Sequence, residues 1–238
     1  MHIAILMTNT DESAFAQAWP RDGEKFSALI SPLRPAWEFS IFAVKDGVFP
    51  ADLVAFDGFI ITGSPASVHD DKPWVAMLLA QIRQIAALGL PMFGACFGHQ
   101  AIAMALGGLV GANPNGWVLG QVETTMNGAP IRLYAAHCEQ VLALPPHARA
   151  IGGNSDCPIG SFACGKTILT TQYHPEMTPD FMAALVDHLD GTLPGHVIAK
   201  ARVSLDQAAE TGRMAQVIVD FLEQAAYESA ASKSIAVT

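Results

Sequence analysis

The cysteine at position 96 lies in the sequence pattern that most clearly offers chemistry. Gly94-x-Cys96-x-Gly98 follows an apolar segment, residues 91–95, and residues typical of a helix come directly after it. Small residues on both sides of the cysteine allow a sharp strand-to-helix turn that presents a nucleophile. The thiol then lies at a helix N-terminus, where the positive end of the helix dipole favours the thiolate. The pattern therefore predicts a nucleophile at Cys96, with a buried, inert cysteine as the alternative.

A histidine and a glutamate later in the chain offer the partner groups for this thiol. The segment TILTTQYHPEM places His174 and Glu176 two residues apart, after β-branched residues typical of a strand. A histidine can take the thiol proton and later donate one to a leaving amine. The carboxylate can hold one imidazole nitrogen and so determine the tautomer. On its own, a solvated His-Pro-Glu turn is the better interpretation, but together with Cys96 the pair indicates a catalytic triad.

Composition and charge exclude several other classes of function. Of the 238 residues, 51% are apolar and 15% are charged, and the net charge is −9. An acidic chain without clustered Lys and Arg argues against nucleic-acid binding. No apolar segment approaches the roughly 20 residues that span a membrane. The segment MHIAILMTNTDES is typical of a first strand rather than an export signal, so we expect a cytoplasmic protein with free cysteines and without a bound cofactor or metal.

Alternating strands and helices are expected to position the triad. Short apolar patterns predict buried strands at residues 2–8, 39–44, 58–62 and 91–95, and helical spacing predicts helices at residues 74–89 and 98–108. This alternation predicts an α/β fold with a mostly parallel sheet flanked by helices. From residue 117 to residue 173, short strand-like segments joined by Asn-Gly, Gly and Pro turns predict a small antiparallel extension.

The C-terminal part of the chain is predicted to be helical. Thr178 as N-cap and Pro179 at the first position predict a helix over residues 178–190. Residues 206–229 predict an amphipathic helix whose apolar face is formed by Met214, Val217, Ile218, Phe221 and Leu222. We expect the residues after it to be frayed. Without a visible linker, the expectation is one domain over residues 1–238, with a catalytic core in 1–192 and a helical extension in 193–238.

Two further patterns are weaker candidates for a site. Residues 160–167, GSFACGKT, match a phosphate-binding loop, but the following ILTTQY predicts a strand where such a loop requires a helix. A hairpin turn is the better interpretation. His69, Asp70 and Asp71 are adjacent residues of an expected loop, and such neighbours seldom converge on one metal ion.

Taken together, the motifs resemble a known enzyme family. GACFGHQ followed by QYHPE is similar to the class I (triad-type) glutamine amidotransferases, which hydrolyse glutamine to glutamate and ammonia. ITGSPASVHDDKPW resembles the loop after the third strand in the free-standing, GMP-synthase-like branch of that family. The resemblance covers roughly residues 1–192. It implies a flavodoxin-like fold, with Cys96 as nucleophile, His174 as base and Glu176 as orienting carboxylate.

The resemblance also implies which groups surround the reacting atoms. The backbone N–H groups of Ser64 and Phe97 correspond to the oxyanion donors. The amino-acid end of the substrate is expected to contact Gly63, Gln100, His137, Cys138 and Glu139. In this last segment the family has Ser/Asn-His-Gly-Asp, whereas this chain has Ala136, Cys138 and Glu139 around the histidine. These departures leave a γ-glutamyl compound as an alternative substrate to free glutamine.

The expected activity is hydrolysis of the glutamine side-chain amide through a γ-glutamyl thioester. The chain contains no ATP-pyrophosphatase Ser-Gly-Gly-x-Asp-Ser loop. Either a separate synthetase partner takes the ammonia, or the protein is a stand-alone γ-glutamyl peptidase. A non-catalytic regulatory subunit is the alternative of another class, although a degenerate triad would be typical of it. The related Cys-His peptidases and chaperones place a histidine directly after the cysteine, where this chain has Phe97. The oligomeric state stays open.

Overall fold

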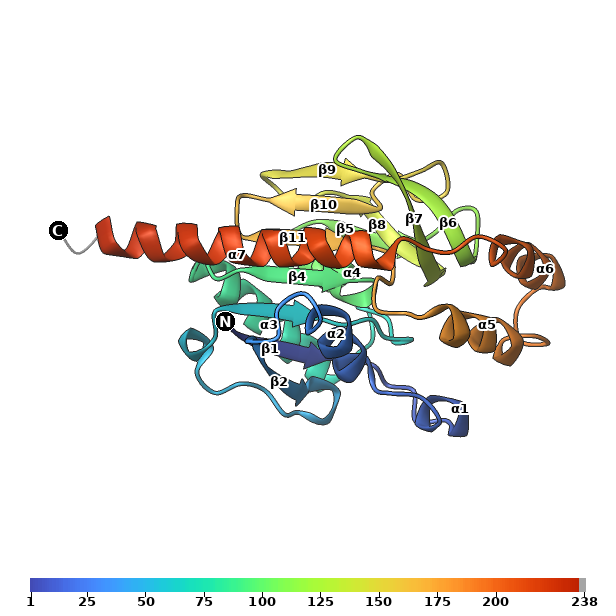
Figure 1. The fold of residues 1–238 in the computed structure, drawn as a ribbon, viewed down its shortest axis with the longest axis horizontal. Helices are drawn as coiled ribbons and strands as arrows, with labels where there is room; N and C mark the ends of the chain where they lie inside the picture. Colours follow the sequence, from blue (N-terminus) through green and yellow to red (C-terminus); the bar gives the residue numbers. More distant parts are fainter. Residues whose placement is uncertain (236–238) are drawn as a thin grey trace.

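A seven-stranded sheet forms the centre of the molecule, with the strand order β2-β1-β3-β4-β11-β10-β9 (Figure 1). The computed structural model describes the backbone of residues 1–235 and the side chains of residues 1–229. The neighbouring strands β2 (Glu38–Ala43), β1 (His2–Met7), β3 (Gly58–Ile61), β4 (Met92–Ala95) and β11 (Ile168–Thr171) are parallel. β10 (Ser161–Cys164) and β9 (Ala148–Gly152) continue the sheet in antiparallel pairing. The predicted mostly parallel α/β sheet is confirmed.

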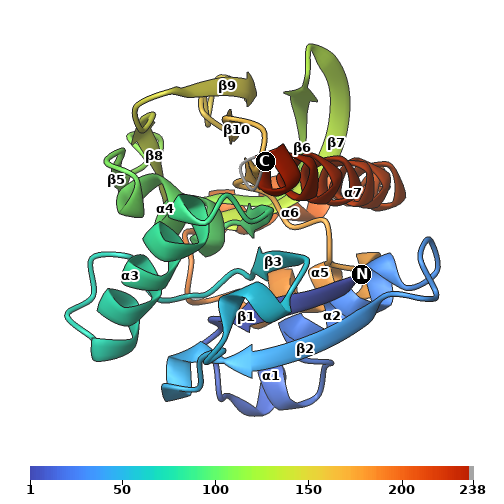
Figure 2. The same cartoon turned by 90° about the vertical axis from the view of Figure 1, so that its left-hand side faces the viewer.

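Helices cover both faces of the sheet because alternate residues of each strand point in opposite directions. Ala4 and Leu6 of β1 pack in the same core as α3 (Pro73–Ala87) and α4 (Phe97–Ala105). Ile3 and Ile5 pack on the other face with α2 (Asp22–Ile30) and α7 (Thr211–Ile235). Figure 2 shows α3 and α4 on one side of the sheet and α7 on the other.

The antiparallel extension lies where the turn-rich sequence predicts it. β6 (Val118–Met126) and β7 (Ala129–His137) form a hairpin, and β5 (Leu109–Ala112) pairs with β8 (Glu139–Ala143). Asn127 and Gly128 both have positive φ, 51° and 78°, as a tight hairpin turn of matching twist requires. The GSFACGKT segment forms β10 and the turn into β11, so the prediction of a hairpin is confirmed there.

The strand predicted at residues 39–44 is present, but it is more exposed than predicted. β2 is the outer strand of the sheet, with β1 as its neighbour, and Ile41 is 42% exposed. The prediction of a buried strand was wrong because apolar residues at a sheet edge resemble those of a central strand in sequence. The sequence analysis also assigned no element to residues 9–37, where the structure has α1 (Ala14–Gln17) and α2.

Three helices form the C-terminal part of the chain. Thr178 Oγ1 accepts a hydrogen bond of 3.2 Å from Phe181 N at the start of α5 (Pro179–His188), which confirms the predicted N-cap. α6 (Gly195–Ser204) was not predicted as a separate helix. The apolar face of α7 is confirmed, since Met214, Ile218 and Leu222 are fully buried. Within the described helices, none is both long and apolar enough to cross a bilayer.

The last turns of α7 correct the expectation of a frayed end. The helix continues from residue 229 to Ile235, through a segment containing alanines that favour helix. The prediction of fraying was therefore wrong up to Ile235, and residues 236–238, to which it also applied, lie outside the described residues.

Candidate active site

Cys96 occupies a strained turn between β4 and α4. Its φ and ψ angles are 49° and −108°, which a residue with a side chain rarely adopts. A Cβ on Gly98 would lie 2.3 Å from the carbonyl oxygen of Ile61, and a Cβ on Gly94 would lie 2.7 Å from that of Gly98. Both flanking glycines are therefore required by close backbone approach. The predicted sharp strand-to-helix turn at Cys96 is confirmed.

The predicted base and its carboxylate are hydrogen-bonded to each other. His174 Nδ1 lies 2.8 Å from Glu176 Oε1, and both side chains are almost fully buried. The backbone N–H of His174 donates to the carbonyl oxygen of Tyr134 at 2.8 Å, which anchors the segment to β7. With Glu176 ionised, Nδ1–H donates to the carboxylate, and Nε2 is left to act on another group. Among the described residues, no group lies at a distance and angle that would form a hydrogen bond with this Nε2.

The side chains of Cys96 and His174 both lie close to Gly63. A Cβ on Gly63 would lie 2.8 Å from His174 Cε1 and 3.5 Å from Cys96 Cβ. Gly63, Cys96 and His174 follow β3, β4 and β11, three neighbouring parallel strands, so they meet at the carboxyl edge of the sheet. Ligands of open α/β sheets bind at this edge.

The electrostatic surroundings of His174 favour its charged form. Burial disfavours the protonated imidazole, but the sulfur of Cys96 and the carboxylate of Glu176 outweigh that effect. Together they hold the pKa of His174 well above its ordinary value. Since a neighbouring negative charge stabilises an imidazolium, this arrangement suits a thiolate–imidazolium pair.

The two predicted oxyanion donors lie on either side of the nucleophile turn. Phe97 is the first residue of α4, and Ser64 follows Gly63 in the loop after β3. The N–H of Gly98 donates to the carbonyl oxygen of Thr62 at 3.1 Å, which ties this loop to the start of α4. Within the described part of the chain, neither the Ser64 nor the Phe97 amide donates to a protein group. Both amides are therefore left without a protein acceptor.

Three of the residues predicted to bind the amino-acid end, Gln100, His137 and Glu139, form a hydrogen-bonded cluster. Gln100 Nε2 donates to Glu139 O at 2.8 Å and to Gln172 Oε1 at 3.2 Å. His137 Nδ1 lies 3.1 Å from the same Glu139 oxygen, and burial lowers the pKa of His137 to about 4. The Glu139 carboxylate accepts a hydrogen bond of 2.8 Å from Ser67 Oγ. Cys138 is partly exposed, and burial raises the pKa of its thiol.

A cavity of about 590 Å³ opens beside the triad. Gly63, Ser64, Cys96 and His174 line its inner end. Its outer wall comes from α1, α2 and α5, as well as the segment that follows β1. Of the predicted substrate-binding residues, Gly63 lines this cavity. Among the described residues, Gln100, His137, Cys138 and Glu139 are not part of its walls.

Comparison with known proteins decides the family. The family model for glutamine amidotransferase class-I matches residues 38–185. This chain belongs to the class-I glutamine amidotransferase family. It is 26% identical over 219 residues to γ-glutamyl peptidase 2 of Arabidopsis thaliana, covering 84% of this chain and 88% of that protein. It is 28% identical over 180 residues to the glutamine-hydrolysing GMP synthase of Aromatoleum aromaticum, covering 63% of this chain and 34% of that protein.

The solved structure of a glutamine amido transferase from Methylobacillus flagellatus has the same fold. Its TM-score is 0.75 with 21% sequence identity, and the match covers 94% of each chain. The predicted family and the predicted fold of the class-I amidotransferases are thus both confirmed.

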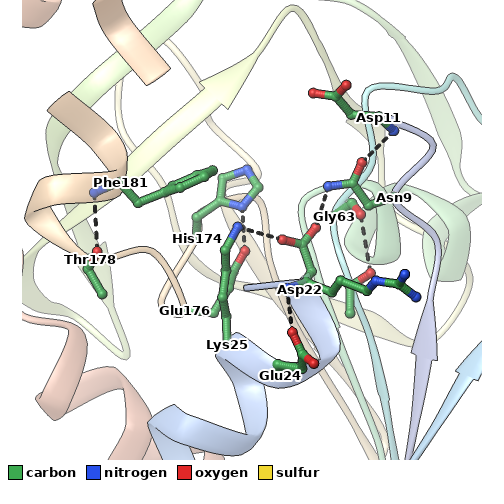
Figure 3. Close-up of polar contacts among 12 residues, drawn as sticks. Asn9, Asp11, Asp22, Glu24, Lys25, Gly63, His174, Glu176, Thr178 and Phe181 are labelled. Carbon is green, nitrogen blue, oxygen red and sulfur yellow. Dashed lines mark hydrogen bonds and ion pairs between the residues drawn. The ribbon is translucent and has the colours of Figure 1, made fainter. Parts of the chain in front are cut away.

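The sequence analysis missed the outer wall of the cavity in this member of the family. Asn9 Nδ2 donates to Asp22 Oδ2 at 2.7 Å, and Lys25 Nζ forms an ion pair of 2.9 Å with Asp22 Oδ1. Figure 3 shows these side chains beside the His174–Glu176 pair. One signal could have located them: Asn9 comes just after β1, at the carboxyl edge of a predicted parallel sheet. In the described residues, no group of His, Cys, Asp and Glu is arranged to hold a metal ion.

Proposed function

We propose that this amidotransferase-family protein hydrolyses γ-glutamyl amide bonds, with Cys96, His174 and Glu176 as its catalytic triad. The observation that carries the proposal is the approach of Cys96 and His174 to the same glycine, Gly63. A cysteine on a strained turn, beside a histidine oriented by a carboxylate, has the parts of an activated nucleophile.

The reaction proceeds through a thioester. The Cys96 thiolate attacks the γ-carbonyl carbon of the substrate, and the carbonyl oxygen takes up the negative charge. As the C–N bond breaks, the His174 imidazolium gives its proton to the leaving amine. Water then attacks the thioester carbon and gives a proton to His174. Glutamate leaves, and the thiolate–imidazolium pair is restored.

The remaining predicted residues have binding roles in this proposal. The N–H groups of Ser64 and Phe97 donate to the developing oxyanion, where backbone donors lower the barrier most. The glutamyl end contacts Gly63 and the cluster of Gln100, His137, Cys138 and Glu139. Because Gln100 Nε2 donates to the backbone of Glu139, Gln100 also holds that segment in place.

The size of the cavity favours γ-glutamyl peptides over free glutamine as substrates. Ammonia, the leaving group of glutamine, is about as large as water and needs roughly 30 Å³. The cavity beside Cys96 has about 590 Å³, which is in the range of sites that bind small organic molecules. Similarity to γ-glutamyl peptidase 2 along 84% of this chain supports the same substrate class.

Hydrolysis of free glutamine for a synthetase partner is the second candidate. The similarity to a glutamine-hydrolysing GMP synthase favours it, and this chain covers 34% of that protein. In this case an acceptor protein would bind over the cavity and take the ammonia.

Glutamate release from each substrate tests the proposal. The purified protein is incubated with glutamine and with γ-glutamyl dipeptides, with Cys96→Ala and Cys96→Ser as controls for the nucleophile. We expect kcat/KM to be at least roughly tenfold higher for dipeptides than for glutamine, as the fit of a larger leaving group allows. Release from glutamine alone would support the second candidate. Turnover by Cys96→Ala would show that Cys96 is not the nucleophile, whereas silence on every substrate would contradict the triad and favour a non-catalytic protein.

A further inference from the structure

The cavity beside Cys96 has walls that indicate which leaving group it accepts. We infer that it is a leaving-group subsite that selects γ-glutamyl amides whose amine carries an aromatic side chain. The reaction itself rests on the function proposed above, whereas the selectivity rests on the walls of the cavity.

The position of the cavity follows from the chemistry of His174. The histidine that protonates the leaving amine must be next to that amine. His174 and Cys96 both line the inner end of the cavity, while the Gln100–Glu139 cluster proposed for the glutamyl end lies outside its lining. A substrate held at both places directs the substituent of its amine into the cavity.

An aromatic wall, defined by Phe15, Trp19 and Phe181, lines part of the cavity. The rings of Trp19 and Phe181 meet edge to face, with centroids 5.3 Å apart and planes at 86°. The ring centroids of Phe15 and Phe181 are 5.8 Å apart. Phe181 is mostly buried, whereas Phe15 and Trp19 are half-buried. An aromatic group entering the cavity can therefore form stacked or edge contacts with these rings, which add to the stabilisation from burial itself.

One ring of the aromatic wall, that of Phe181, is held in place by a buried charge pair. Lys25 Nζ lies 3.6 Å from the centroid of the Phe181 ring and forms its ion pair with Asp22. The side chains of Lys25 and Asp22 are only 10% and 7% exposed, and Asn9 donates to the second oxygen of Asp22. Figure 3 shows Phe181, Lys25 and Asp22 near the His174–Glu176 pair. Because these contacts hold Phe181 in place before a ligand arrives, little ordering of this ring is needed on binding.

Two dipeptides that differ only in the side chain of the leaving amino acid test this selectivity. The probes are γ-glutamyl-phenylalanine and γ-glutamyl-alanine, which carry the same carboxylate. We expect the wild-type protein to prefer the phenylalanine dipeptide by roughly tenfold or more in kcat/KM. Trp19→Ala should reduce this ratio to less than about threefold, and Trp19→Phe should retain most of it. Tyr227→Ala removes an aromatic ring that is 78% exposed on α7 and should leave the ratio unchanged.

Binding to Cys96→Ala separates a failure of the subsite from a failure of the proposed reaction. The affinities of the two dipeptides are measured by calorimetry with Cys96→Ala and with Cys96→Ala combined with Trp19→Ala. Selective binding of γ-glutamyl-phenylalanine without turnover by the wild type would retain the subsite and overturn the reaction. Turnover of both dipeptides at equal kcat/KM, or a ratio unchanged in Trp19→Ala, would overturn the subsite alone. Neither binding nor turnover would overturn both.

Discussion

Gly98 lies so close to Ile61 that a methyl group on Gly98 would be 2.3 Å from the Ile61 carbonyl oxygen. This contact sets the first turn of α4, which follows Cys96, directly against the end of β3. The loop after β3 carries Gly63 and Ser64, and it is tied to α4 by the bond from Gly98 N to Thr62 O. The position of the nucleophile relative to one proposed oxyanion donor therefore depends on close contact between two backbones.

The contact predicts that Gly98→Ala displaces the nucleophile turn. Since the obstructing atom belongs to the backbone, we expect a loss of about 1–3 kcal/mol in the free energy of unfolding, together with lower kcat/KM. Urea denaturation and glutamate release measure the two effects. Gly195→Ala is the control, because nothing lies within 4 Å of the added Cβ, and its free energy should change by less than about 0.5 kcal/mol. Equal effects of the two substitutions would contradict the prediction.

Glu176→Gln should lower kcat by roughly 10²–10⁴-fold while KM changes little. The Glu176 side chain is fully buried and bonded to His174 Nδ1, so its charge both orients and stabilises the imidazolium. Glutamate release from a γ-glutamyl dipeptide gives kcat, and circular dichroism checks the fold. Glu223→Gln removes a partly exposed carboxylate paired with Arg34 and serves as the control with unchanged kcat. A Glu176→Gln protein of normal kcat would remove Glu176 from the triad.

The pKa of His174 should fall when the thiol is removed. A negative sulfur stabilises the imidazolium, so Cys96→Ala removes one of the two groups that hold this pKa above its ordinary value. Burial, which lowers the pKa of His174, is then opposed by Glu176 without the help of the sulfur. NMR titration of the imidazole Cε1 proton in the wild type and in Cys96→Ala measures the change. Glu176→Gln is expected to shift the pKa in the same direction, and an unchanged or higher pKa in Cys96→Ala would show that no thiolate lies beside His174.

Two buried histidines predict that the protein loses stability in mild acid. Burial lowers the pKa of His99 to about 3 and that of His137 to about 4. Histidines of the unfolded chain take up protons near pH 6.5, so the unfolded state binds more protons below that pH. Between pH 6.5 and pH 5, each histidine should therefore lower the free energy of unfolding by about 1.6 kcal/mol. His174 acts in the opposite direction and to a smaller extent, because its raised pKa keeps it protonated in the folded state while the unfolded histidine completes its protonation below pH 6.5.

Urea denaturation at pH 7.5, 6.5, 5.75 and 5 measures this dependence. His137→Gln should flatten it, since one buried titrating group is removed. A free energy of unfolding that stays constant over this range, or the same slope in His137→Gln, would contradict the assignment of the loss to these side chains.

Local sequence was sufficient for the parts of the site that are contiguous in the chain. The glycines around Cys96 specify a sharp turn because a Cβ at either position would clash, at Gly94 with α4 and at Gly98 with the end of β3. His174 and Glu176 are two residues apart, so one short turn brings the imidazole to the carboxylate. Likewise, Thr178 and the Asn127-Gly128 turn could be interpreted without knowledge of distant residues. These features depend on the steric limits of neighbouring residues, which a sequence displays directly.

Tertiary structure decided what depends on the order of strands. Periodicity predicted that residues 39–44 form a strand. The strand order places β2 at the exposed edge of the sheet, where β1 is its one neighbour. Cys96 and His174 meet at Gly63 because β3, β4 and β11 are neighbours whose carboxyl ends lie together. The cavity depends on α1, α2 and α5, which come from distant parts of the chain and show no shared motif. Hydrophobic patterns report which face of an element is buried, whereas the packing of whole elements determines which residues meet across a site.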